Sequence, residues 1–221
     1  NMNYLDLLKS TKASYCLINE KNLNLINQKK TIPIVTNNPL IDFITIAKLF
    51  YPESDSDFCN FRIHKKYLKI KKTNNSFIGF NVTVGKNFEI GLNSVIKKNV
   101  NIGDNVKIGS NCIISNTKIG NNVIINDGTV IGKIGFGFKK IKNKLVFIPH
   151  FGYVDLEDNV YIGSCCTIDR GSFYKTIIKK NTMIDNQVHI AHNVSIGSNC
   201  YIAGQTGIAG SSVIGNNCLI G

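Results

Sequence analysis

An aliphatic residue returns at every sixth position through most of this chain. The positions are Ile78, Val84, Ile90, Ile96, Ile102, Ile108 and Ile114, then Ile119, Ile125 and Ile131, then Leu156, Ile162 and Ile168, and finally Ile178, Ile184, Ile190, Ile196, Ile202, Ile208, Ile214 and Ile220. Neither the period of a helix nor the alternation of a strand matches six. Three short strands per coil do, and this pattern is typical of hexapeptide solenoids.

The third residue after the aliphatic position supports the same fold. It is asparagine at eleven positions: Asn81, Asn87, Asn93, Asn99, Asn105, Asn111, Asn122, Asn181, Asn193, Asn199 and Asn217. Asparagine tolerates the left-handed backbone conformation that tight corners need. The period therefore predicts a parallel β-helix with about 18 residues per coil. Its left-handed sense is taken from known hexapeptide proteins.

Two features depart from this period. Residues 133–153, "KIGFGFKKIKNKLVFIPHFGY", must leave the solenoid as a loop or small hairpin. Such an excursion adds nothing to the repeat core, so it favours a functional role. The chain also stops in mid-repeat without a capping element and begins with Asn1 where a methionine belongs. An uncapped coil exposes backbone and apolar groups, so we expect a C-terminally truncated fragment.

The first 58 residues follow a different pattern. Residues 13–18 and 31–35 are expected to form short strands. Asn38 and Pro39 then provide an N-cap and first-turn proline for a helix that ends at Phe50. Its expected apolar face consists of Leu40, Phe43, Ile44, Ala47 and Phe50. We therefore predict a small, N-terminally incomplete α/β domain over 1–58, with a linker at 53–57. The β-helix follows over 59–221, beginning with an irregular coil near 62–77.

Composition limits the possible partners and locations. The net charge is +12, but Arg62 and Arg170 are the only arginines, so lysine supplies 24 of the 26 basic residues. The basic runs lack the interleaved aromatic residues of a single-strand binder, so nucleic acid is not an expected partner. No stretch approaches the roughly 20 apolar residues of a membrane span, and the N-terminus lacks a secretory signal. We expect a cytoplasmic protein without stable membrane insertion.

The cysteines point to a reduced protein. Seven cysteines without a CxxC spacing indicate neither a disulfide framework nor a zinc ribbon. Four of them recur at one position of the repeat, namely Cys112, Cys166, Cys200 and Cys218. They are expected to be small buried residues of the solenoid.

Two of the four histidines lie close together in "DNQVHIAHNVSIG", residues 185–197. Ile190 should point inward, which turns His189 outward and leaves His192 at the approach to a corner. Gly210 follows His192 by 18 residues, one coil in the predicted fold. An imidazole beside an exposed glycine amide suits acyl transfer, with a base for the nucleophile and a donor for the oxyanion. His189 would line the approach. Both histidines could instead be ordinary surface residues.

Longer motifs carry a resemblance to a known family. "IDRG" followed by "IDNQVHIAHNV" is specific, with "GFGF" and "FIPHFGYVDLEDNVYIGSCCT" before it, "IAGQTGIAGSSVIG" after it and "NNPLIDFITIAKLF" in the first domain. Together they resemble the UDP-3-O-acylglucosamine N-acyltransferases of the lipid A pathway. The resemblance implies transfer of a 3-hydroxyacyl group from acyl carrier protein to the glucosamine 2-amine. The 4'-phosphopantetheine of the carrier would hold the acyl group, and no other cofactor is implied.

The same resemblance assigns residues. His192 matches the catalytic base and Gly210 the glycine whose amide faces the oxyanion. Asp185 and Asn186 match the motif beside the base, where they would support it or contact sugar or pantetheine.

The resemblance also extends to the first domain and to the assembly. Tyr4 would stack on uracil with Asn1 nearby, although Tyr4 could equally be a packed residue. Family members are trimers with active sites between neighbouring solenoids, so a homotrimer is expected.

Some family features differ here. The aspartate that usually precedes "GFG" in the family is replaced here by Ile134. The first stacking aromatic, the later coils and the C-terminal helices of the family lie outside this sequence. His150 and His64 are expected to be structural or loop residues.

Three alternatives stay open. A related UDP-sugar O-acyltransferase or an acetyl-CoA-dependent sugar acetyltransferase would also carry a histidine in a β-helix. A trimeric zinc enzyme would use His150, His189 and His192 as ligands, although the last two should splay apart. A purely structural solenoid would leave the histidine pair and the excursion unexplained.

Overall fold

The computed structural model of the chain describes residues 4–27, 29–52, 54, 75–79, 81–141 and 143–221. The chain divides into two compact units, residues 1–53 and 54–221. The predicted boundary between residues 58 and 59 lies outside the described residues, as do most of the predicted linker and most of the irregular coil. No helix in the described part is long and apolar enough to cross a membrane.

The first unit is a small α/β arrangement. Its elements are α1 (Tyr4–Lys9), β1 (Tyr15–Ile18), the 3-10 helix η1 (Glu20–Leu25), β2 (Ile32–Val35) and α2 (Pro39–Phe50). Strands β1 and β2 pair in parallel, and the Asn38 side chain caps α2 at the amide of Ile41. Ile44 and Ala47 of α2 are buried, but Phe50 is 76% exposed. Phe50, at the end of the expected apolar face, is the last residue of the helix.

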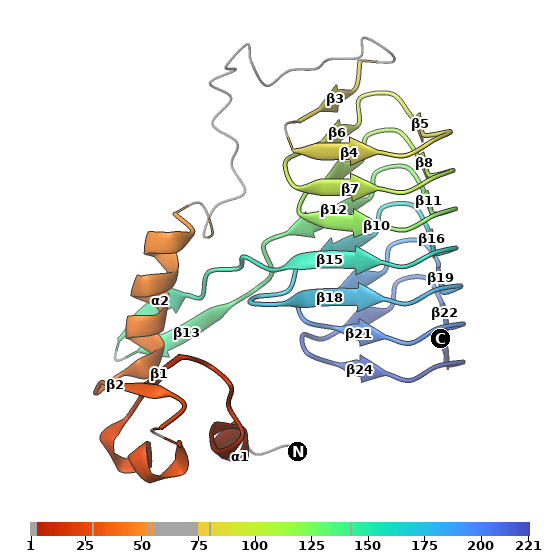
Figure 1. Cartoon of the computed structure of the whole chain (residues 1–221). Coiled ribbons are helices and arrows are strands. Elements are labelled where there is room, and N and C mark those ends of the chain that lie inside the picture. The colour runs from red at the N-terminus through yellow and green to blue at the C-terminus, as the bar shows by residue number, and fades with distance from the viewer. Residues whose placement is uncertain (1–3, 28, 53, 55–74, 80, 142) are drawn as a thin grey trace. The chain divides into compact units, whose positions relative to one another are not determined.

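The second unit is a solenoid of three parallel sheets, each with seven strands (Figure 1). We call them by one member each. The β20 sheet contains β3 (Phe77–Ile78), β6 (Val95–Ile96), β9 (Ile113–Ile114), β12 (Val130–Lys133), β17 (Thr167–Asp169), β20 (His189–Ile190) and β23 (Gly207–Ile208).

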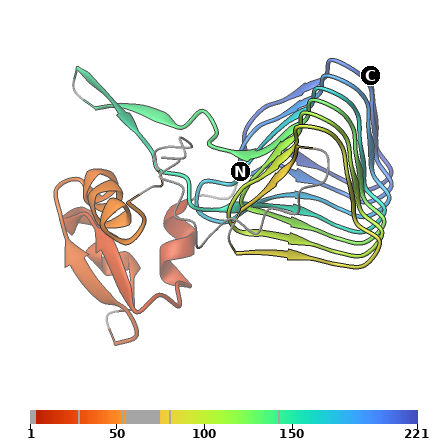
Figure 2. The same ribbon diagram turned by 90° about the horizontal axis from the view of Figure 1, so that it is seen from above.

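The β21 sheet contains β4 (Val82–Val84), β7 (Val100–Ile102), β10 (Thr117–Ile119), β15 (Tyr153–Leu156), β18 (Lys175–Ile178), β21 (Ser195–Ile196) and β24 (Val213–Ile214). The β22 sheet contains β5 (Glu89–Ile90), β8 (Lys107–Ile108), β11 (Ile124–Ile125), β16 (Tyr161–Ile162), β19 (Met183–Ile184), β22 (Tyr201–Ile202) and β25 (Leu219–Ile220). Seen along the stack, the three sheets form the sides of superposed triangular coils (Figure 2). The predicted hexapeptide β-helix is confirmed.

The core runs along the inside of this stack. Repeat isoleucines such as Ile96, Ile162 and Ile190 are fully buried. Burial of one such side chain is worth about 1.5–3 kcal/mol, and parallel pairing stacks them in register. Cys112, Cys166 and Cys200 fill the second inward position completely, as predicted, whereas Cys218 is only partly buried.

The corners are held by left-handed asparagines. All eleven asparagines predicted from the period have φ between 54° and 61°. Along the corner between the β21 and β22 sheets, each asparagine side chain bonds to the next at 2.8–3.3 Å. The members of this asparagine ladder are Asn87, Asn105, Asn122, Asn159, Asn181, Asn199 and Asn217. The side-chain amides of successive coils therefore pair in the same register as the backbone strands.

Residues 134–152 leave the stack between β12 and β15. They contain an antiparallel hairpin of β13 (Phe138–Ile141) and β14 (Lys144–Phe147). Gly132 turns the chain out with φ of 80°, and a Cβ there would lie 1.6 Å from the Ser115 carbonyl oxygen. Only glycine fits at this exit.

Candidate functional site

His192 lies at the corner between β20 and β21. The next residue, Asn193, has φ of 61° and makes the turn, as the repeat predicts. Its amide donates to Thr176 Oγ1 at 2.9 Å, and its side-chain oxygen accepts from the amide of Ser172 at 2.6 Å. Bonds to neighbouring chain segments therefore fix the backbone that carries the imidazole.

Gly210 lies at the same corner one coil further on. A Cβ built on Gly210 would lie 2.9 Å from both Cε1 and Nε2 of His192. The carbonyl oxygen of His192 accepts from the amide of Ser211 at 2.9 Å. The stacking inferred from the spacing of 18 residues is therefore present, with the tip of the imidazole against the glycine.

The excursion covers the other side of His192. A Cβ on Gly135 would lie 2.9 Å from the Cβ of His192 and 3.0 Å from its Cδ2. The ring of His150 meets that of His192 edge-on, at 5.3 Å between centroids and 79° between planes. His192 is therefore half-buried rather than simply directed to solvent. Within the described part of the chain its Nδ1 is buried and has no hydrogen-bond partner.

This environment favours the neutral imidazole. Burial lowers the pKa of His192 below its ordinary value of 6.5, because desolvation disfavours the imidazolium. The nearby backbone of Phe136 acts in the opposite direction but does not reverse the shift. A neutral ring near neutral pH can accept a proton, and the nitrogen beside Gly210 is Nε2.

His189 lies on β20, one strand residue before the buried Ile190. It is exposed, and its Nδ1 is 2.7 Å from Thr167 Oγ1 on the preceding coil. On the following coil it pairs with Gly207, where a Cβ would meet no atom within 4 Å. His189 thus lines an open strip beside the corner that holds His192.

Asp185 and Asn186 are at a different corner. They follow β19 and precede β20, whereas His192 follows β20. The Asn186 side chain caps the amide of Ser164 at 2.7 Å. The motif therefore spans one side of the triangle, and the chain does not by itself bring the carboxylate to the imidazole.

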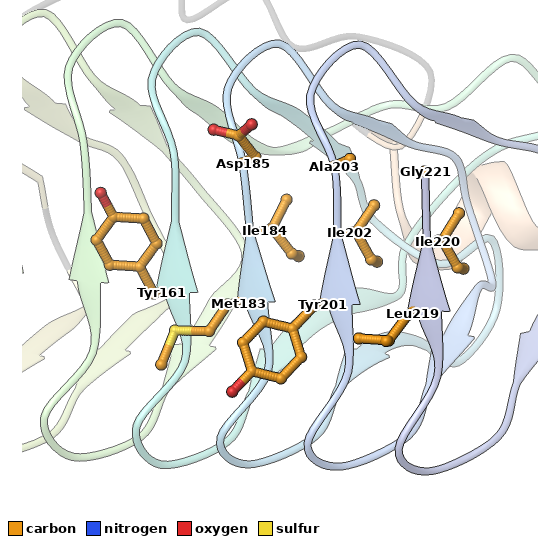
Figure 3. A pocket seen from close by; sticks show the side chains of 10 residues that line it. All are labelled: Tyr161, Met183, Ile184, Asp185, Tyr201, Ile202, Ala203, Leu219, Ile220 and Gly221. Carbon is orange, nitrogen blue, oxygen red and sulfur yellow. The ribbon is translucent and has the colours of Figure 1, made fainter.

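An open groove of about 470 Å³ lies along the β22 sheet on the side of Asp185 (Figure 3). Tyr161, Met183, Tyr201 and Leu219 line it from successive strands, and Asp185 follows Ile184 on the strand that carries Met183 (Figure 3). Their exposed fractions rise from 38% to 79%. The groove is mostly apolar and lies away from His192.

Three other residues named in the sequence analysis lie wholly or partly outside the described residues. Asn1 and His64 lie outside the described residues. Tyr4 begins α1, but its side chain is outside the described part. Among the described residues no group of three or more histidine, cysteine or acidic side chains could hold a metal ion.

Sequence reasoning missed the contacts made by the excursion. His150, expected to be only a structural or loop residue, is fully buried against His192. The concentration of glycines in "GFGF" was the available signal, since Gly135 meets His192 and Gly137 meets His150. Their partners depend on how the hairpin folds back, which the repeat period does not encode.

The fold and its corner site define a class of protein. The family described as "Bacterial transferase hexapeptide (six repeats)" matches residues 99–133 and 175–210. The chain therefore carries hexapeptide repeats of this kind in both stretches.

Individual relatives give a more specific comparison than the family model. The chain is 39% identical over 207 residues to UDP-3-O-acylglucosamine N-acyltransferase 2 of Nitrobacter winogradskyi, a match of 88% of this chain and 60% of that protein. It is 40% identical over 202 residues to UDP-3-O-acylglucosamine N-acyltransferase of Helicobacter pylori, covering 88% and 58%. The resemblance drawn from the motifs is confirmed. The chain spans about three fifths of the length of these relatives.

A solved structure agrees on the fold. A UDP-N-acetylglucosamine acyltransferase from Bacteroides fragilis superposes with a TM-score of 0.56 and 32% identity. The superposition covers 64% of this chain and 54% of that one.

Proposed function

We propose that the protein is an N-acyltransferase that moves a 3-hydroxyacyl group from acyl carrier protein to the 2-amine of UDP-3-O-acylglucosamine in lipid A biosynthesis. The observation that carries the proposal is the half-buried His192 with its Nε2 against the backbone of Gly210. Similarity over 88% of the chain to two UDP-3-O-acylglucosamine N-acyltransferases supports the choice of acceptor.

The chemistry follows from this corner. The glucosamine amine attacks the thioester carbonyl, and the neutral His192 accepts the amine proton at Nε2. The developing oxyanion receives the Gly210 N–H, which makes no hydrogen bond within the described residues. The C–N bond forms, the C–S bond breaks, and the imidazolium returns its proton to the departing pantetheine thiolate. General-base help is worth about 10²–10⁴-fold, and loss of an oxyanion donor costs about 10²–10³-fold.

The other assignments form part of this proposal. Asp185 and Asn186 would contact the sugar, the pantetheine or the base, and His189 would line the approach to the base. Tyr4 and Asn1 would contact the uracil. The roles of these residues are predictions.

A homotrimer is consistent with the distance between Asp185 and His192 within one chain. Asp185 and His192 occupy different corners of one solenoid, so a neighbouring subunit must supply the other half if both serve one site. The exposed apolar side chains of the β22 sheet, Tyr161, Met183, Tyr201 and Leu219, are suited to partial burial in such an assembly.

A related O-acyltransferase is the second candidate, because the Bacteroides fragilis neighbour is a UDP-N-acetylglucosamine acyltransferase. The experiment offers the full-length protein two acceptors, UDP-3-O-acylglucosamine and UDP-N-acetylglucosamine, and two donors, acyl carrier protein thioester and acyl-CoA. Mass spectrometry should detect an amide product from the first acceptor with the carrier-bound donor. Ester product from the second acceptor alone would overturn the proposal in favour of the O-acyltransferase.

A further inference from the structure

His150 is a buried titratable residue that the proposed mechanism does not use. It is fully buried, and its Nδ1 is 2.8 Å from the carbonyl oxygen of Ile148. A carbonyl can only accept, so Nδ1 carries the proton. One face of the ring stacks on Phe147 at 5.8 Å and 26°, and the ring meets His192 edge-on at 5.3 Å. These contacts fix the plane of His150 against the proposed base.

Two glycines of the excursion make this packing possible. A Cβ on Gly137 would lie 2.4 Å from Cε1 of His150, and a Cβ on Gly135 would lie 2.9 Å from the Cβ of His192. The amide of Gly137 donates to the carbonyl of Gly135 at 3.0 Å, so the two glycines form one tight turn. One short stretch of backbone therefore contacts both imidazoles.

Arg170 anchors the base of the hairpin. It is 4% exposed; its Nε donates to the carbonyl of His150 at 2.9 Å and its Nη1 to the carbonyl of Gly132 at 3.1 Å. Its amide also donates to the carbonyl of Lys133 at 2.9 Å. One guanidinium thus joins the two ends of the excursion, which places His150 at a fixed distance from the solenoid corner.

We propose that His150 is a positioning residue for His192: held by Arg170 and by the Gly135–Gly137 turn, it sets the orientation in which His192 presents Nε2 to the corner at Gly210. This inference rests on the proposed function. A ring held on one side by His150 and Gly135 and at its tip by Gly210 has little freedom to rotate. Such fixed orientation matters because misplacement of a catalytic group by about 1 Å can cost about 10²-fold in rate.

The charged groups around His192 allow a clean readout. On the hairpin, His150 faces the ring. On the preceding coil, β17 ends at Asp169 and is followed by Arg170, which donates to the carbonyl of His150, and neither of these charged residues changes in the variants. The corner at residues 209–211 and the neighbours of His192 in its own corner, Ala191 and Asn193, carry no charge. A change in the titration of His192 on replacing His150 therefore reports burial and orientation.

The test compares His150→Ala and His150→Phe in the full-length protein, with Leu145→Ala as control because Leu145 is on the same hairpin and 75% exposed. His150→Ala should lower kcat about 10-fold to 10²-fold with KM changed less than about twofold. It should also move the pKa of His192, followed by NMR of its ring, up toward the ordinary value. His150→Phe keeps the ring packing and should recover most of kcat, and Leu145→Ala should match the wild type.

Each outcome decides the question. An unchanged kcat and an unchanged His192 titration in His150→Ala would overturn the inference. A folded His150→Phe protein as slow as His150→Ala would also overturn it, because His150 would then act through its nitrogen atoms. If His150→Ala does not fold, His150→Leu replaces it, because leucine also lacks the ring that packs against His192. The NMR titration needs no substrate, so it tests the inference even if the wild type makes no amide, a result that would count against the proposed function alone.

Discussion

The position of the His192 side chain is limited by two glycines. Gly135 approaches the root of the imidazole and Gly210 its tip, and at both positions a Cβ would lie 2.9 Å from the nearest atom of the histidine. Real Cβ atoms do not approach so closely, so the ring would have to move. Because the excursion limits movement of the imidazole on the other side, a methyl group added at Gly210 should change the rate of the reaction.

Gly210→Ala should therefore lower kcat by about 10²-fold or more, because it displaces the imidazole and crowds the oxyanion position. Gly215→Ala is the matched control, since it lies at a different corner and the added Cβ would meet no atom closer than 3.9 Å. Steady-state kinetics on both variants checks this prediction. Equal activity of the two variants would mean that the contact between His192 and Gly210 has no part in the reaction.

The stacking of Gly210 on His192 could be predicted from the sequence, but the packing of the excursion over His192 could not. Coil length alone stacks Gly210 on His192, because parallel strands keep register along a solenoid. Gly135 and His150 belong to a segment without the repeat, and their places depend on long-range bonds such as those of Arg170 to Gly132 and His150. No local periodicity carries that information.

Among the elements, the corners differ in how strongly the local sequence specifies them. The asparagine ladder occupies the corner between the β21 and β22 sheets without a break. At the other two corners Cys165, Gln187, Gln205 and Ser211 also have positive φ, although none of these residue types favours it. The stacked coils impose the turn there, which is why the sequence identified the asparagine corners and missed these four.

Asn181 lies within the ladder and bonds to Asn159 and Asn199, both at 3.0 Å. Asn181→Ala should lower the free energy of unfolding by about 1–3 kcal/mol, since it loses exposed hydrogen bonds and places alanine at φ of 59°. Asn181→Gly loses the same bonds without the left-handed penalty and should be less destabilised. Denaturant unfolding followed by circular dichroism measures both. If glycine were no better than alanine, the backbone conformation would not be the reason for asparagine at this corner.

For the whole molecule, the important separation is the one between Asp185 and His192. One precedes β20 and the other follows it, so they occupy different corners of the same coil. The sequence placed Asp185 beside the base, because the motif "DNQVHIAHNV" is continuous in sequence and does not reveal this separation. If both residues serve one reaction, the complete site belongs to an assembly of subunits.

Mixed assemblies test this point. His192→Ala and Asp185→Ala subunits, carrying different affinity tags and expressed together in full length, should form trimers in which some interfaces contain both native residues. Activity of the doubly purified mixture should exceed that of either variant assembled alone. A mixture no more active than its parents would contradict a site shared between subunits.

The role of His192 as the base is the central claim, and the dependence of kcat/KM on pH tests it most directly. Because burial lowers the pKa of His192 below 6.5, the wild-type protein should keep its neutral, active imidazole below that pH and lose amide formation only at still lower pH. His192→Ala should be about 10²–10⁴-fold slower and should lack this acidic limb. Amide formation by His192→Ala at the wild-type rate, with the same acidic limb, would contradict the account.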